Sequence, residues 1–136
     1  MATRLSHLGI AVPAHDDVLV FWRDLLGLPV EHIEHVPGDG VSVAMLRLGE
    51  GSGAVELLEP DPGESPVGKF LAKRGPGLHH VAFEVDDIDG LLNRMKDANI
   101  RLIDEQPRAG AHGTTVAFVH PASTGGVLVE LVASSG

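Results

Sequence analysis

The chain contains no cysteine, and it carries few basic residues. Without cysteine, the sequence excludes disulfide bonds, thiolate catalysis and cysteine-bound zinc. Ten Lys and Arg stand against 19 Asp and Glu, which gives a formal net charge of −9. This balance argues against nucleic acid or an anionic membrane as a partner, whereas a small anionic ligand needs only a local basic patch.

Long apolar runs are also missing. No stretch approaches the length of a membrane span, and no basic segment followed by an apolar run opens the sequence. We therefore expect a cytoplasmic protein with no part in a membrane. A chain of 136 residues is long enough for one compact domain, and we expect residues 1–136 to form it.

An internal repeat is the most informative feature that is present. When His7 is aligned with His80, the apolar positions of the two strand-like segments coincide. The apolar segments around Glu56 and Glu130 match at almost the same offset. The domain is therefore predicted to consist of two modules, each with one histidine early and one glutamate late.

The patterns predict the same element order, β-α-β-β-β, in both modules. The first module covers about residues 4–60, with strands at 5–12, 28–36, 41–48 and 54–59 and a helix of apolar spacing near 16–26, capped by Asp16 or Asp17. The second covers about 77–133, with strands at 78–85, 101–103, 115–120 and 127–132 and a helix at 87–98. Between them, residues 61–76 form a connection and a short helix that starts at Ser65-Pro66 and ends at Gly75.

The repeated residues are of types that bind metal ions. Adjacent residues on a strand face opposite sides, and the repeat selects His80 rather than His79. Taken singly, each glutamate reads as solvent-facing and each histidine as a hydrogen-bonded imidazole. Two equivalent pairs instead favour a metal site. The expected ligands are His7, Glu56, His80 and Glu130, a set that suits Zn²⁺, Co²⁺, Ni²⁺ or Mn²⁺.

The other histidines carry weaker signals. We expect His15, His32 and His35 to be solvated, and His79 to face the opposite side of its strand from His80. His112 is flanked by small residues in a long loop, from which it can reach a ligand.

The two halves resemble the βαβββ modules of the vicinal oxygen chelate (glyoxalase) superfamily, and the motifs narrow the resemblance to the methylmalonyl-CoA epimerase family. The matching segments are residues 7–12, 56–60, 65–71, 77–88, 110–113 and 125–131. The resemblance implies an α+β fold in which two pseudo-symmetric modules form a cupped mixed β-sheet around a metal site. It also implies the same four metal ligands that the repeat indicates.

The resemblance implies a metal-dependent isomerase, which interconverts (2R)- and (2S)-methylmalonyl-CoA through a metal-stabilised enolate. We assign Glu56 and Glu130 as the acid and base that act on opposite faces of the substrate, with His112 as an alternative for the second proton. Some members carry Gln where this chain has Glu56. Members of the family also carry a Glu, proposed as a base, where this chain has Val43.

The coenzyme A tail carries phosphates, for which cationic side chains are expected. The candidates are Lys69, Lys73, Arg74 and Arg108, with solvated charges as the equally plausible reading. The resemblance further suggests propionate metabolism and a homodimer.

Two other functions fit the same fold. One is a glyoxalase I-type lyase, which shares the fold, the ligand set and the proton-transfer chemistry. The other is a metal-free small-molecule-binding or resistance protein, a class that generally lacks the four ligands.

Overall fold

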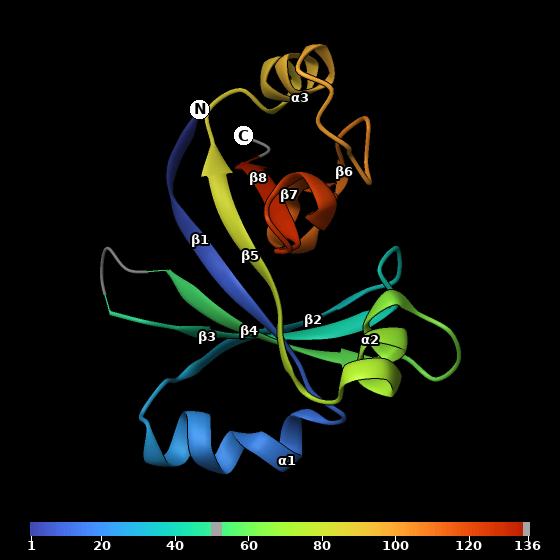
Figure 1. Ribbon diagram of the computed structural model, residues 1–136. Helices are drawn as coiled ribbons and strands as arrows, with labels where there is room; N and C mark the ends of the chain where they lie inside the picture. The colour runs from blue at the N-terminus through green and yellow to red at the C-terminus, as the bar shows by residue number, and fades with distance from the viewer. Residues whose placement is uncertain (50–52, 135–136) are drawn as a thin grey trace. The chain divides into compact units, whose positions relative to one another are not determined.

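The computed structural model describes residues 1–49 and 53–134, and it divides into two compact units. The first unit is His7–His79, and the second unit combines Met1–Ser6 with the segment from His80 onward. Two strands, β1 (Ala2–Ala11) and β5 (Gly77–Val85), contribute residues to both units. Hydrogen bonding links the strands in the order β2-β3-β4-β1-β5-β8-β7-β6 (Figure 1).

The first unit follows the predicted order of strand, helix and three strands. Its further elements are α1 (His15–Leu19), the π-helical η1 (Val20–Leu25), β2 (Val30–Val36), β3 (Val41–Arg47), β4 (Ala54–Pro60) and α2 (Pro66–Arg74). β4 pairs parallel with β1 and antiparallel with β3, and β3 pairs antiparallel with β2.

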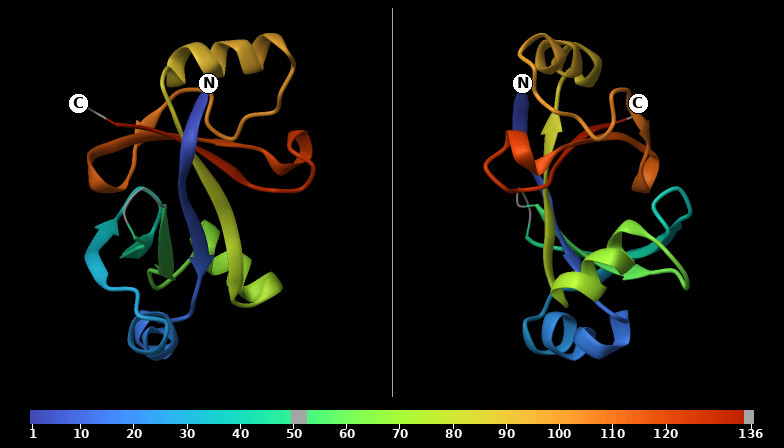
Figure 2. Two further views of the ribbon diagram at one scale, coloured as in Figure 1. Left: turned by 90° about the vertical axis from the view of Figure 1, so that its left-hand side faces the viewer. Right: turned by 45° about the vertical axis from the view of Figure 1, so that its right-hand side comes forward.

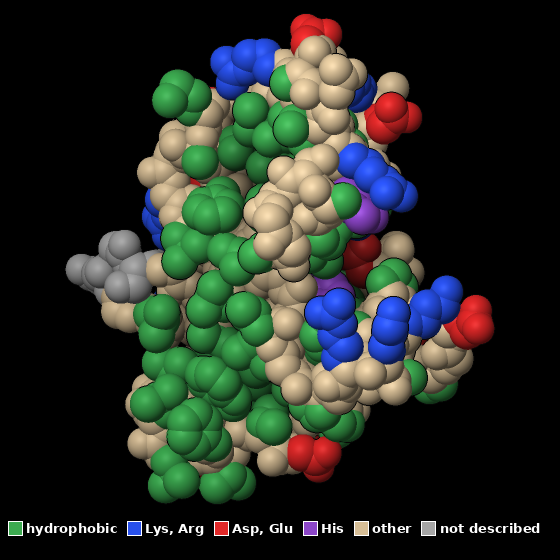
Figure 3. All heavy atoms as spheres, viewed as in Figure 1, with side chains coloured by type: hydrophobic (Ala, Val, Ile, Leu, Met, Phe, Trp, Pro, Cys, Tyr) green, Lys and Arg blue, Asp and Glu red, His purple; other side chains and the backbone are tan. Residues whose placement is uncertain are grey.

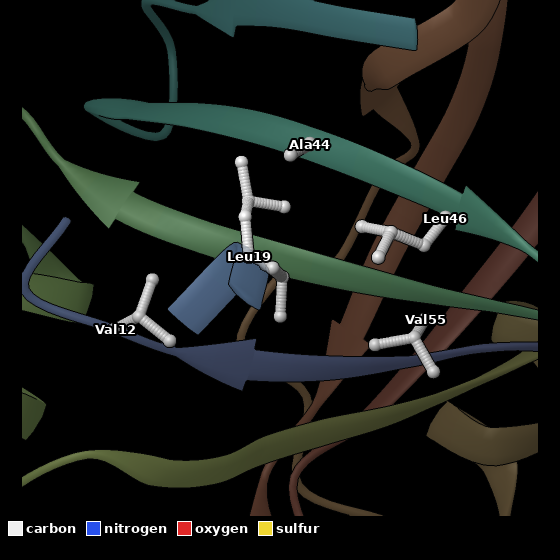
Figure 4. Packing of buried hydrophobic residues seen from close by; sticks show 6 residues of the cluster. Val12, Leu19, Ala44, Leu46 and Val55 are labelled. Carbon is white, nitrogen blue, oxygen red and sulfur yellow. The ribbon is translucent and has the colours of Figure 1, made fainter. Parts of the chain in front are cut away.

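One face of these strands is apolar and packs beneath α1. Leu19 of α1 meets Val12, Leu46 and Val55 in a buried cluster that also contains Ala44 and Leu57 (Figure 4). Because strand residues alternate, the neighbours of these core residues, among them Glu56, lie on the opposite face.

The helix after β1 differs from its prediction. Ala14 occupies the N-cap without a side-chain hydrogen bond, so neither Asp16 nor Asp17 caps the helix. After Leu19 the chain winds as a π-helix, in which the Leu26 N–H donates to the Phe21 carbonyl at 2.8 Å. The wider turn shifts the helical phase, and Phe21, one of the apolar residues of the predicted helix, is 54 % exposed.

The helix in the connection agrees with its prediction. Ser65 is the N-cap of α2, its hydroxyl accepts from the Gly68 N–H at 3.0 Å, and Pro66 takes the first position. Gly75 ends the helix with φ of 78°, a conformation that side chains with a Cβ rarely adopt.

The second unit repeats the plan around α3. Its further elements are α3 (Ile88–Asp97), β6 (Arg108–Ala109), a 3₁₀ turn η2 (Ala111–Gly113), β7 (Thr114–Val119), a 3₁₀ turn η3 (Pro121–Ser123) and β8 (Val129–Ser134). β8 pairs parallel with β5 and antiparallel with β7. Figure 2 shows α3 on one side of these strands, where Ile88 and Leu92 pack on Ala117 and Leu131.

One predicted strand of the second module is wrong. Residues 101–103 form no strand, and Leu102 makes a single bridge to Val119. The short β6 pairs with β7 further along the chain, at a place where the sequence predicts a loop. The eight hydrogen-bonded strands confirm the predicted mixed sheet of an α+β fold. The assignment of residues 1–136 to a single domain stays a prediction.

No helix within the described ranges is both long and apolar enough to cross a membrane.

The core cluster under α1 yields a stability prediction. Leu57→Ala removes a side chain that is 0 % exposed, and we expect it to lower the free energy of unfolding by about 2–5 kcal/mol. Leu78→Ala is the matched control, because Leu78 is 55 % exposed and its loss is expected to cost no more than about 0.5 kcal/mol. Urea unfolding followed by circular dichroism measures both, and equal midpoints would contradict the assigned core.

Candidate metal-binding residues

The first unit brings one histidine and one glutamate together. His7 lies on β1 opposite Ala54 of β4, and Glu56 lies opposite Gly9. Positions 7, 9 and 56 therefore share one face of the sheet. His7 Nδ1 is 3.3 Å from Glu56 Oε2, and each side chain is 8 % exposed.

Helix α1 determines which way this pair points. The residues next to Glu56 in the sequence, Val55 and Leu57, belong to the core under α1, so Glu56 faces away from that helix. Gly9, which pairs with Glu56 on β1, carries no side chain on this face. On the other side of β4, Met45 of β3 lies directly opposite Glu56.

The second unit contains an equivalent pair. His80 lies on β5, and Ala82, two residues later, pairs with Glu130 of β8. His80 Nε2 is 3.1 Å from Glu130 Oε1, and the side chains are 5 % and 10 % exposed. Ala82 takes the place that Gly9 has in the first unit, and Phe118 of β7 lies opposite Glu130 as Met45 lies opposite Glu56.

These pairs provide the chemistry of a metal site. A buried carboxylate in an apolar strand requires a partner, and in each unit an imidazole supplies it. Across the described residues, every buried side-chain nitrogen or oxygen has a hydrogen-bond partner. Each unit thus offers one nitrogen and one oxygen donor from a buried position, and both donor types are ones that borderline divalent ions accept.

The structure corrects the prediction for His15. This side chain is buried rather than solvated, with 7 % exposure. Its Nε2 lies 3.0 Å from the Ser42 carbonyl oxygen and 2.9 Å from that of Leu57, so Nε2 carries the proton and donates to both strands. The sequence carries no signal for this role, because the acceptors are main-chain oxygens of distant residues.

The other histidines lie where the sequence places them. His32 and His35 are exposed and pair with Glu34 at 3.1 Å and Asp61 at 2.7 Å. His79 packs edge to face on Phe70 of α2, with ring centroids 5.1 Å apart. It therefore has a different partner from His80, which contacts Glu130.

His112 and Val43 bear on the second acid or base. His112 is exposed in η2 and adopts φ of 58°, a left-handed conformation uncommon for residues other than glycine. Val43 is 3 % exposed and shares the face of Met45 and Glu56 on β3 and β4. An apolar side chain thus stands where family members were expected to carry a carboxylate.

The predicted cations of the connecting helix are exposed. Lys69, Lys73 and Arg74 all belong to α2, and basic side chains gather over this helix in Figure 3. The Arg74 guanidinium carbon lies 5.9 Å from the centroid of the Phe70 ring. Arg108 belongs to the second unit, where it pairs with Asp104.

Sequence reasoning missed Asp104 and Phe118 beside the histidine–glutamate pair, and it considered Arg108 only for the coenzyme A tail. Asp104, Arg108 and Phe118 form one connected group in the second unit, and the Phe118 ring contacts His80. Phe118 lies in the predicted strand 115–120, but only the register of β7 against β8 shows that it is opposite Glu130. Asp104 lies outside any strand, and no pattern indicates it.

Comparison with known proteins is consistent with this geometry. Residues 6–118 match the family model of the glyoxalase/bleomycin resistance protein/dioxygenase superfamily. Methylmalonyl-CoA epimerase of Mus musculus mitochondria is 42 % identical over 94 % of this chain and 71 % of its own. The ethylmalonyl-CoA/methylmalonyl-CoA epimerase of Cereibacter sphaeroides is 38 % identical over 96 % of this chain and 98 % of its own.

The chain belongs to the methylmalonyl-CoA epimerases of this superfamily. A solved methylmalonyl-CoA epimerase in complex with methylmalonyl-CoA and NH₄⁺ superimposes with a TM-score of 0.94, at 38 % identity, over 100 % of this chain and 97 % of that one. The comparisons confirm the family, the fold class and the epimerase activity predicted from the sequence. The predicted ligands and catalytic residues stay predictions.

Strand alternation yields a test that separates two neighbouring histidines. We expect His80→Ala to weaken Co²⁺ binding by at least 100-fold, because it removes a nitrogen donor beside Glu130. His79→Ala is the control, and it should leave the dissociation constant within twofold, since His79 contacts Phe70. Titration calorimetry measures both constants, and a loss of equal size in the two variants would refute the assignment of His80.

Proposed function

We propose that this epimerase inverts the α-carbon of methylmalonyl-CoA with the help of one divalent ion held by His7, Glu56, His80 and Glu130. The observation that carries the proposal is the repetition of a buried imidazole–carboxylate contact, at 3.3 Å in the first unit and 3.1 Å in the second. Two independent solvent-facing pairs would be neither buried nor matched in strand position. The complex of a full-length structural relative with methylmalonyl-CoA supports the choice of substrate.

A bound divalent ion supplies Lewis-acid stabilisation of the negative charge that develops on the thioester oxygen when the α-proton leaves. Zn²⁺, Co²⁺, Ni²⁺ and Mn²⁺ suit two imidazoles and two carboxylates. The histidines contribute by holding the carboxylates: each imidazole contacts one glutamate oxygen and restricts the positions that the carboxylate can take.

The proton transfers are assigned to the two glutamates. One carboxylate of Glu56 or Glu130 removes the α-proton from one face, and the other group returns a proton to the opposite face. Both side chains are at most 10 % exposed, so little water competes with the substrate for the carboxylate oxygens. Val43 has no ionisable group, so a base at that position is excluded, and exposed His112 is the alternative proton donor.

Proton exchange tests this assignment directly. In heavy water the wild type should exchange the α-proton of methylmalonyl-CoA for deuterium, as followed by proton NMR, and a chelator should stop the exchange. We expect Glu130→Gln to slow exchange by about 10²–10⁴-fold, since an amide cannot accept the proton.

Glu105→Gln is the matched control, because Glu105 is an exposed carboxylate of the same unit. It should exchange at the wild-type rate. Unchanged exchange in Glu130→Gln would exclude Glu130 as acid or base. Turnover of a hemithioacetal instead of methylmalonyl-CoA would favour a glyoxalase I-type lyase.

For the coenzyme A tail we propose the exposed cations of α2 as phosphate contacts. Lys69, Lys73 and Arg74 lie within nine residues of one helix whose N-cap is Ser65. They supply local positive charge in a chain with a net charge of −9, where long-range attraction for a phosphorylated substrate is absent. Arg108 of the second unit remains a further candidate.

Charge reversal separates tail binding from chemistry. We expect Lys73→Glu to raise KM for methylmalonyl-CoA roughly fivefold or more with kcat unchanged, and high salt should reduce the difference. Methylmalonyl-pantetheine lacks the phosphorylated nucleotide, so the variant should turn it over like the wild type. Lys96→Glu on α3 is the control. An equal KM increase for both thioesters would contradict a phosphate contact.

Three further expectations belong to the same proposal. They are a cytoplasmic location, a role in propionate metabolism and a homodimer. The apolar side chains exposed on η1 and at its C-cap support the dimer: Val20, Phe21, Leu25 and Leu26 are each more than half exposed, and apolar surface covers this part of the first unit in Figure 3.

A further inference from the structure

Four side chains of the second unit form a connected column that ends at His80. The His80 and Phe118 rings meet edge to face, with centroids 5.5 Å apart and an interplanar angle of 89°. The guanidinium carbon of Arg108 lies over the Phe118 ring at 5.5 Å from its centroid. Arg108 Nε in turn donates to Asp104 Oδ1 at 3.1 Å.

Asp104 holds this column at two points. Its Oδ2 accepts from the backbone N–H of Phe118 at 2.9 Å, while Oδ1 holds the Arg108 side chain. The backbone N–H of Asp104 also donates to the Phe118 carbonyl at 3.2 Å. The Asp104 side chain is only 17 % exposed, so its charge is less screened than that of a surface carboxylate.

Phe118 is placed to restrict the His80 ring. It lies directly opposite Glu130 in the β7–β8 register, on the face that carries His80. Edge-to-face aromatic contacts and a cation over a ring face both have preferred geometries. Because Phe118 makes both of these contacts, its ring has little freedom, and the imidazole plane of His80 is restricted with it.

We propose that Asp104 is a positioning residue for His80: it holds Arg108 against Phe118, and Phe118 sets the orientation in which the imidazole meets a metal ion. This inference rests on the proposed function, in which His80 is a ligand. Groups that orient a ligand from outside the coordination sphere typically change metal affinity by about 10–100-fold when they are removed.

The first unit provides an internal comparison. There Arg47 Nε donates to Glu31 Oε2 at 2.9 Å, and Arg47 Nη2 lies 3.3 Å from the Met45 sulfur, opposite Glu56. The same acid–arginine arrangement therefore ends on a flexible thioether rather than on an aromatic ring. A methionine imposes no ring plane on a neighbour, so Glu31→Gln is a matched control for Asp104→Asn.

The test measures the Co²⁺ dissociation constant of the wild type, of two single variants and of the double variant, which together form a double-mutant cycle. Asn keeps the size of Asp and can still accept from the Phe118 N–H, but it carries no charge for Arg108. We expect Asp104→Asn and Phe118→Leu each to raise the Co²⁺ dissociation constant about 10-fold. The double variant should stay near 10-fold rather than reach 100-fold, because both changes act through one contact. Glu31→Gln should stay within twofold.

Two measurements separate positioning from general destabilisation. Val119→Ala removes a buried core side chain next to Phe118, on the face under α3, and should lower the melting temperature without changing the Co²⁺ constant. In the metal-free protein, the His80 ring protons should change chemical shift in Asp104→Asn and in Phe118→Leu, and should keep it in Glu31→Gln.

Wild-type affinity and His80 shifts in Asp104→Asn would overturn the inference, as would additive losses in the double variant or a loss of equal size in Val119→Ala. If the wild type bound no Co²⁺, the proposed metal function would fail. In that case the His80 shifts of the metal-free variants would still decide whether Asp104 positions the ring.

Discussion

The site depends on the two faces of a β-strand. In each unit a helix covers one face with apolar side chains, Leu19 of α1 in the first and Leu92 of α3 in the second. The residues that alternate with this core must point to the other face, and there a carboxylate is tolerable only with a partner. Glu56 and Glu130 each find a histidine on the strand that pairs in parallel. Core packing and the polar pairs therefore follow from the same strand register. A slip of one residue would turn the glutamates toward the core and the core residues toward the opposite face.

Much of this arrangement was predictable, because the chain contains its own comparison. The repeat aligned the histidines and the glutamates, and it selected His80 rather than His79. The bounds of α2 were also predictable, because Ser65 at its N-cap and Gly75 at its C-terminus are typical helix start and stop residues. The prediction for α2 is confirmed, because both of its signals depend on neighbours in the chain.

The predictions that were wrong share a cause: at these positions the structure depends on contacts that the local sequence pattern does not show. The π-helical turn after Leu19 shifts which side chains are buried, and a pattern read at 3.6 residues per turn cannot show it. His15 is buried because two carbonyl oxygens from separate strands receive its N–H. Residues 101–103 form no strand, because the backbone N–H groups of Ile103 and Asp104 both donate to the Phe118 carbonyl. Leu102 therefore makes only one bridge, to Val119.

The two units repeat the histidine–glutamate pair but not the residues around it. Glu56 faces Gly9 and Met45 across neighbouring strands, whereas Glu130 faces Ala82 and Phe118. The proposed substrate explains why equal surroundings are unnecessary. Coenzyme A is itself chiral, so the two faces of the enolate present different shapes, and an acid and a base on opposite sides work in different environments. In the proposed mechanism, duplication supplies the two carboxylates that inversion requires, and the different surroundings fit each carboxylate to its own face of an asymmetric thioester.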